Sequence, residues 1–146
     1  MLALLSLVVA LAAMGVAAWA IAMAWPKKES TPQPTAESKQ KVCAAFDTVS
    51  RAVQLQTHAD LGPDPVAQTA VASNARLSLI GGGEYLRSQL DDQTAPELAD
   101  AVRMFANNLE DIGVNALAGV TNDDPQQAAR LTAGEDGRNK VADLCK

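Results

Sequence analysis

Few side chains in this 146-residue chain could carry out chemistry: two cysteines, Cys43 and Cys145, and a single histidine, His58. A nucleophilic thiol or hydroxyl requires a histidine base within hydrogen-bond reach. His58, however, stands next to Asp60 and a Gly-Pro turn, a setting typical of a helix end. The chain has no C-x-x-C motif for redox chemistry or metal binding. We therefore expect no thiol- or histidine-based catalytic centre and no metal site.

The carboxylates are no better arranged for catalysis. They occur as sequence neighbours, and no calcium-loop spacing is present. Asp123-Asp124 comes directly before a predicted helix, where an aspartate caps free backbone N–H groups. We expect no enzymatic activity and no cofactor. The adjacent pairs are Asp91-Asp92, Glu110-Asp111 and Asp123-Asp124.

Four stretches after residue 36 have the periodicity of helices, and no alternating β-branched run predicts a sheet. Two of them open with Asp-Pro, an N-cap residue followed by proline at the first helical position. Another opens with a Thr-x-x-Glu capping box from Thr94 to Glu97. The predicted helices span residues 37–58, 64–80, 94–116 and 124–144.

Apolar residues mark one face of each of the first three helices, which predicts an up-down four-helix bundle in an all-α domain. Aromatic residues are scarce, so the core must consist mainly of Ala, Val, Leu and Ile. The predicted faces are Val42, Phe46, Val49 and Val53; Val66, Ala70, Ser73, Leu77 and Ile80; and Leu98, Val102, Phe105, Leu109, Ile112 and Ala116.

This topology determines where the cysteines lie. The start of the first helix and the end of the fourth lie at the same end of an up-down bundle, so Cys43 and Cys145 should meet. A disulfide closing about 100 residues stabilises a fold by at most about 4.7 kcal/mol in the chain-entropy model. We predict a Cys43–Cys145 disulfide; two free buried thiols are the alternative.

Three consecutive glycines, Gly81 to Gly83, follow the second helical pattern. A phosphate-binding loop would need a preceding strand and a following Lys-Ser/Thr, and Glu84 follows here. Each glycine inside a helix costs about 1 kcal/mol relative to alanine. Either the helix breaks, or another element packs against the bare backbone. We predict the close crossing, with the helix resuming to Leu90.

Residues 1–25 contain no charged side chain and one polar side chain, Ser6. As a helix this segment would be roughly 37 Å long, enough to cross a bilayer. A signal peptide has a charged start and a shorter apolar core, although Ala22 to Ala24 would offer a cleavage site. We expect a retained transmembrane anchor over 1–25, a Pro-rich spacer over 26–36 and an extracytoplasmic bundle over 37–146.

Small residues in the predicted span favour close packing against other membrane helices. Two tryptophans near its end fit the membrane interface. The expected partners are therefore the lipid bilayer and a multi-pass membrane protein. The predicted packing residues are Ala13, Gly15, Ala17, Ala18 and Ala22, and the predicted interfacial anchors are Trp19 and Trp25.

Charge bears on orientation and on partners. Lys27 and Lys28 would place that end of the span in the cytoplasm, whereas a disulfide persists outside it. We favour the external domain. The net charge of −5 argues against nucleic-acid binding. Eight acidic residues and one basic residue between Asp91 and Asp124 form either solvated helix faces or an acidic docking patch.

Two inner stretches, ASNARLSLIGGGEYL and PELADAVRMFANNL, together with the layout of span, spacer and terminal cysteine, resemble small single-pass envelope proteins of actinobacteria, notably mycobacteria. The greatest similarity is to the lipid-uptake coordinator subunit of the Mce (mammalian-cell-entry) lipid transporter. The resemblance implies a helix beside the permease and a periplasmic bundle against the transporter's outer assembly. It carries over no site residues.

Three functions fit these features. The first is a non-catalytic accessory subunit that stabilises or regulates an Mce-type transporter. The second is a stand-alone anchored protein that binds a lipid or peptide in an apolar groove, and a cavity that fits an acyl chain would favour it. The third is an accessory subunit of the respiratory supercomplex, which predicts the same anchor and bundle as the first.

Overall fold

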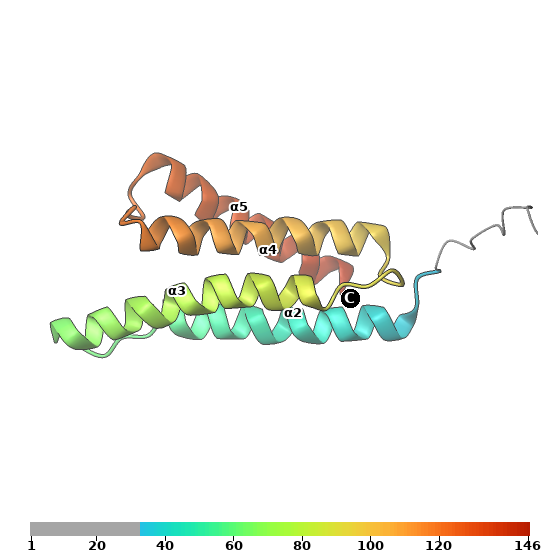
Figure 1. Cartoon of the computed structure of the whole chain (residues 1–146), viewed down its shortest axis with the longest axis horizontal. Coiled ribbons are helices and arrows are strands. Elements are labelled where there is room, and N and C mark those ends of the chain that lie inside the picture. Colours follow the sequence, from blue (N-terminus) through green and yellow to red (C-terminus); the bar gives the residue numbers. More distant parts are fainter. Residues whose placement is uncertain (1–32) are drawn as a thin grey trace, which may run out of the picture. The chain divides into compact units, whose positions relative to one another are not determined.

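Four helices make up the part of the chain that the computed structural model describes, residues 33–146. They are α2 (Ala36–Thr57), α3 (Pro65–Ser88), α4 (Pro96–Leu117) and α5 (Pro125–Leu144), shown in Figure 1. The prediction of an all-α unit with four helices is confirmed.

The predicted span over 1–25 lies outside the described residues. Within 33–146, none of the helices is both long and apolar enough to pass through a bilayer. The predictions that lie outside the described part concern Ala13, Gly15, Ala17, Ala18, Ala22, Trp19 and Trp25.

Short polar side chains start three of the helices. The Asp64 side chain accepts from the N–H of Ala67 at the start of α3. Asp124 accepts from two N–H groups in the first turn of α5. Thr35 caps α2 in the same way. Each cap satisfies backbone N–H groups that have no partner within the helix. The two predicted Asp-Pro starts are confirmed.

The capping box predicted at Thr94 is wrong. α4 begins at Pro96, its N-cap is Ala95, and no side chain caps it. Proline disfavours the helical conformation in the residue before it, so Ala95 takes the cap position and Thr94 lies one residue too early. The buried Thr94 hydroxyl instead donates to Asp91.

One continuous core joins all four helices. α4 lies at its centre and supplies half of its residues, and the rings of Phe46 and Phe105 meet edge to face with their centroids 5.8 Å apart. The predicted faces of the first and third helices are thus confirmed. The core residues are Val42, Ala45, Phe46, Val49, Leu79, Leu86, Leu98, Ala101, Val102, Phe105, Ala106, Leu109, Ile112 and Val141.

The face predicted for α3 is wrong. Val66 and Leu77 are 77% and 70% exposed, and the buried residues of α3 are Leu79, Gly83 and Leu86. Figure 1 shows that the first turns of α3, which begins at Pro65, project beyond the end of α4. The half of α3 that follows Leu79 carries the packing.

Gly82 and Gly83 lie at the predicted close crossing, Gly81 does not, and α3 runs through all three glycines without a break. A β-carbon on Gly82 would stand 2.7 Å from Cγ1 of Val49 in α2. On the other side, Gly113 of α4 leaves room for Ile80. Glycine lets both neighbouring helices approach the α3 backbone, and the helix ends at Ser88.

α5 crosses α4 obliquely, as Figure 1 shows, and small residues again mark the contact. Gly134 faces Asn108 and Ile112, and Gly137 faces the ring of Phe105. At the start of α5, the fully buried Gln127 donates from Nε2 to the carbonyl oxygen of Ile112 at 3.1 Å. α5 is therefore fixed to α4 along its length and remains helical through both glycines.

Candidate functional site

The predicted disulfide is present. Cys43 in α2 is bonded to Cys145, the C-cap of α5, and their Cα atoms are 5.6 Å apart. Both residues are half-buried against the edge of the core. The bond joins the first and last described helices across 102 residues. The helices otherwise pack mainly in chain order, α2 on α3, α3 on α4 and α4 on α5.

A groove of about 610 Å³ lies between α2 and α5, because these two helices contact each other at few positions. Its lining is mostly apolar and includes side chains from all four helices. The apolar lining consists of Phe46, Val53, Leu79, Phe105, Leu109, Ile112, Leu131 and Ala142. Such a volume lies within the range of about 300–1,000 Å³ that is common for ligand sites.

Charged side chains from both helices stand at the edges of the groove. Asp47 and Arg51 come from α2, and Glu135 and Arg138 come from α5. Glu135 and Arg138 form an ion pair one turn apart. The hydrogen bonds from Arg138 lower the pKa of Glu135, and those same bonds raise the pKa of Arg138. Both groups therefore stay charged across the neutral range.

One polar atom in the groove wall has no partner. The Oγ atom of Ser50 is inaccessible to solvent and makes no hydrogen bond with any described residue. A buried hydroxyl without a partner costs free energy.

His58 also lies at the groove, as the C-cap of α2. Its Nδ1 is 2.9 Å from the carbonyl oxygen of Gln54, and the residue is exposed. The prediction that it occupies a helix end is confirmed. Within residues 33–146 no cluster of three metal-ligating side chains occurs.

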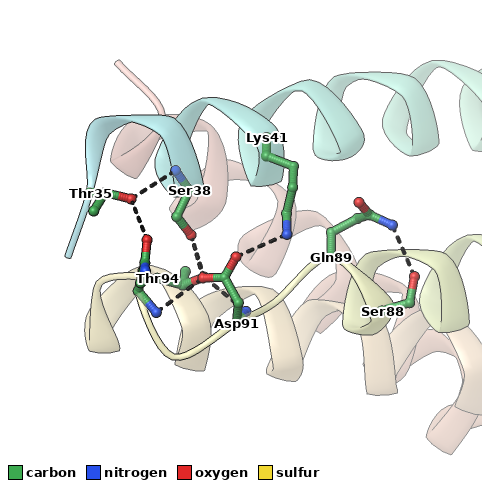
Figure 2. A network of polar contacts seen from close by, with 8 residues as sticks. Thr35, Ser38, Lys41, Ser88, Gln89, Asp91 and Thr94 are labelled. Atoms are coloured by element: carbon green, nitrogen blue, oxygen red, sulfur yellow. Dashed lines mark hydrogen bonds and ion pairs between the residues drawn. The ribbon is translucent and has the colours of Figure 1, made fainter. Parts of the chain in front are cut away.

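A second polar cluster, shown in Figure 2, holds the α3–α4 loop against the start of α2. Asp91 Oδ1 accepts from Ser38 Oγ at 2.7 Å and from Thr94 Oγ1 at 3.1 Å, and Asp91 Oδ2 pairs with Lys41 Nζ at 2.9 Å. Ser38 and Thr94 are buried. The bond from Ser38, followed by that from Lys41, lowers the pKa of Asp91 far below its usual range.

The acidic stretch from Asp91 to Asp124 is largely engaged within the protein. Asp91, Glu97 and Glu110 pair with basic residues of other parts of the chain, Lys41, Lys140 and Arg87. Asp100 pairs with Arg103, and Asp124 caps α5. This distribution favours solvated helix faces over an acidic docking patch, the two interpretations that the sequence allows.

The sequence did not indicate the groove. α5 has few large apolar residues, and Leu131, at the groove, is 38% exposed. That composition was a usable signal, because a helix with so little apolar surface cannot cover α2 as well as α4.

Comparison of the chain with protein-family models, with curated proteins and with solved structures found no match. The function is therefore inferred from the groove, the disulfide and the exposed side chains.

Proposed function

We propose that this chain is a non-catalytic, membrane-anchored accessory subunit of an envelope complex. In its most specific form, the proposal is that it stabilises or regulates an Mce-type lipid uptake transporter. An accessory subunit of the respiratory supercomplex would have the same anchor and the same helical unit. In either case the helical unit binds an extracytoplasmic part of its complex.

The observation that carries the proposal is the groove between α2 and α5. Its buried apolar floor belongs to the core, Val53, Leu131 and Ala142 of its lining are exposed at least in part, and charged residues flank it on both helices. An amphipathic helix or extended segment of a partner protein binds in such grooves by placing its apolar side chains inside. The groove side of the unit therefore has the form of a receptor for a partner segment.

Further apolar side chains are exposed away from the groove. An isolated exposed leucine is ordinary, but α3 carries three exposed large apolar residues, Val66, Leu77 and Tyr85. Large apolar residues in solvent are typical of proteins that bind others. The exposed large apolar residues are Leu55, Leu61, Val66, Leu77, Tyr85, Met104, Val114, Leu117 and Leu131.

The disulfide supports an extracytoplasmic location for the helical unit. Such bonds persist in oxidising compartments and are rare in the reducing cytosol. A bond between Cys43 and Cys145 also keeps the end of α5 close to the start of α2, the part nearest the predicted spacer. A helical unit whose last helix is bonded close to the start of its first suits an accessory role beside a membrane partner.

The test is purification of the full chain, tagged after Lys146, in mild detergent from its native membrane, with identification of the proteins that accompany it. A transporter permease or an oxidase in the eluate would choose between the two complexes. Leu131→Glu, at the groove, should reduce recovery of the partner, and Gln126→Glu, at an exposed polar position of α5 outside the groove, should not. Recovery of the wild-type chain alone and monomeric would rule the proposal out.

The groove volume also favours a second function, binding of an apolar small molecule such as an acyl chain. In that case lipid extracted from the purified wild-type protein should be reduced in Leu131→Trp, which places a large ring in the groove and narrows it. Equal lipid content in the two proteins would argue that the lipid comes from the detergent–membrane mixture and not from the groove.

A further inference from the structure

We propose that the Cys43–Cys145 disulfide is a reducible closure of the α2–α5 groove, so that thiol–disulfide exchange regulates what the groove retains. The inference rests on the proposed function, because it concerns the same groove. It adds a control element: the bond determines the distance between the two helices that form the groove.

The first step of the argument is that α5 does not need α2 to remain in place. Gln127 bonds to the backbone of Ile112 at one end of α5, and Lys140 Nζ lies 2.7 Å from Glu97 Oε1 toward the other. Val141 is fully buried. The contacts of Gln127 and Lys140 attach α5 to α4, and neither involves α2.

The same holds for α2. Val49 packs into the space that Gly82 leaves on α3. Ser38 and Lys41 bind Asp91 in the α3–α4 loop. α2 thus has its own attachment on the other side of the molecule. Few contacts other than the disulfide link α2 directly to α5.

The second step is that the bond lies about one helical turn from the groove. Asp47, one turn after Cys43, lines the groove on one side and also lines a separate surface hollow of about 390 Å³. Both cysteines line this hollow. The disulfide therefore joins α2 to α5 at a hollow that borders the groove at Asp47, where it limits how far the two helices can separate.

The third step is access. The hollow is open to solvent, and its other lining residues include Lys39 and Gln40. A small dithiol or the active-site dithiol of an oxidoreductase can approach a sulfur from this side. The nearby Lys39 ammonium group stabilises an attacking or departing thiolate.

A dithiol supplies the two electrons and two protons that reduction of the disulfide requires. One thiolate of the dithiol attacks a sulfur of the Cys43–Cys145 bond, forms a mixed disulfide and releases the other cysteine as a thiolate. The second thiol of the reductant then attacks the mixed disulfide. Two electrons pass from the dithiol to the protein, which leaves Cys43 and Cys145 as thiols and the reductant as a cyclic disulfide.

The test measures the groove directly and needs no ligand. Spin labels are attached through p-acetylphenylalanine at positions Arg51 and Asn139, which are exposed on α2 and α5. A control pair is placed at the exposed positions Met104 and Asp136 on α4 and α5. Distances in the full chain are measured by double electron–electron resonance before and after treatment with dithiothreitol, and in the double variant Cys43→Ser with Cys145→Ser.

We expect the 51–139 distance to lengthen and its distribution to broaden on reduction, while the 104–136 distribution and the helical circular dichroism stay unchanged. Coincident 51–139 distributions in the oxidised and reduced proteins would overturn the inference. So would broadening of both pairs with loss of helicity, because the bond would then hold the fold and not the groove. If the distance changes but the purified chain brings no partner, the closure stands and the proposed function fails.

Discussion

The carbonyl oxygen of Ala106 in α4 lies 2.6 Å from the point at which a β-carbon on Gly83 of α3 would stand. α3 and α4 therefore meet backbone to backbone at this position. The packing one turn to either side depends on that approach, since Leu79 and Leu86 of α3 are both buried in the core.

Gly83→Ala is expected to lower the free energy of unfolding by about 1–3 kcal/mol, because the added carbon meets a backbone atom that cannot rotate away. Gly81→Ala is the matched control. No atom lies within 4 Å of its added carbon, so the better helix propensity of alanine should raise stability by up to about 1 kcal/mol. Urea unfolding followed by circular dichroism measures both; equal effects would contradict the close crossing.

Asp91→Asn should lower the thermal unfolding midpoint at neutral pH. The folded protein lowers the pKa of Asp91 through bonds from Ser38 and Lys41, so the carboxylate stabilises the fold above its unfolded pKa of about 3.9. That contribution diminishes as the pH falls below about 4. The difference in midpoint between wild type and variant should therefore shrink on acidification.

The exposed neighbour Asp92 supplies the control for this pH dependence. Asp92→Asn keeps the same loop and makes the same change of charge, and it should alter the midpoint little at any pH. A difference between wild type and Asp91→Asn that stayed constant from pH 7 to pH 3 would show that the carboxylate charge is not what holds the loop to α2.

Gln127→Ala should destabilise the protein by about 2 kcal/mol or more, because it removes a buried side chain and the partner of the Ile112 carbonyl oxygen. Gln126→Ala changes the same residue type one position earlier, where the side chain is exposed, and should cost less than about 0.5 kcal/mol. Chemical unfolding compares the two, and similar losses would show that Gln127 does not anchor α5.

Leu77→Lys tests the uncovered part of α3. The side chain is 70% exposed, so the change should leave stability within about 0.5 kcal/mol of wild type. If α3 contributes to partner binding, the same change should reduce co-purification of the partner. Arg76→Lys, which keeps the charge at the neighbouring position, should not. Unchanged recovery with Leu77→Lys would confine the interface to other surfaces.

Local chemistry explains why parts of this fold were predictable. An aspartate before a proline allows few structures other than a helix start, and the helices after Asp64 and Asp124 begin as expected. The cysteine pairing followed from helix number and direction alone. The membrane anchor, the orientation and the partner remain predictions.

The face of α3 could not be predicted in the same way. Gly82 and Gly83 bury backbone and supply no apolar side chain. The face of α3 that packs against the other helices therefore contributed little to the hydrophobic pattern of the sequence. Val66 and Leu77, on the wrong face, dominated it. The position of the groove could not be predicted for a related reason. The groove results from the oblique crossing of α5 over α4 at Gly134 and Gly137, and the spacing of apolar residues does not determine the angle at which two helices cross.

The Cys43–Cys145 disulfide also has a mechanical consequence. A pulling force applied between the start of α2 and Lys146 would travel through about two turns of helix, cross from Cys43 to Cys145 and leave again. α3, α4 and most of α5 lie off that line of tension. The protein can therefore carry a tensile load between its two ends without extending the segment that the covalent ring encloses.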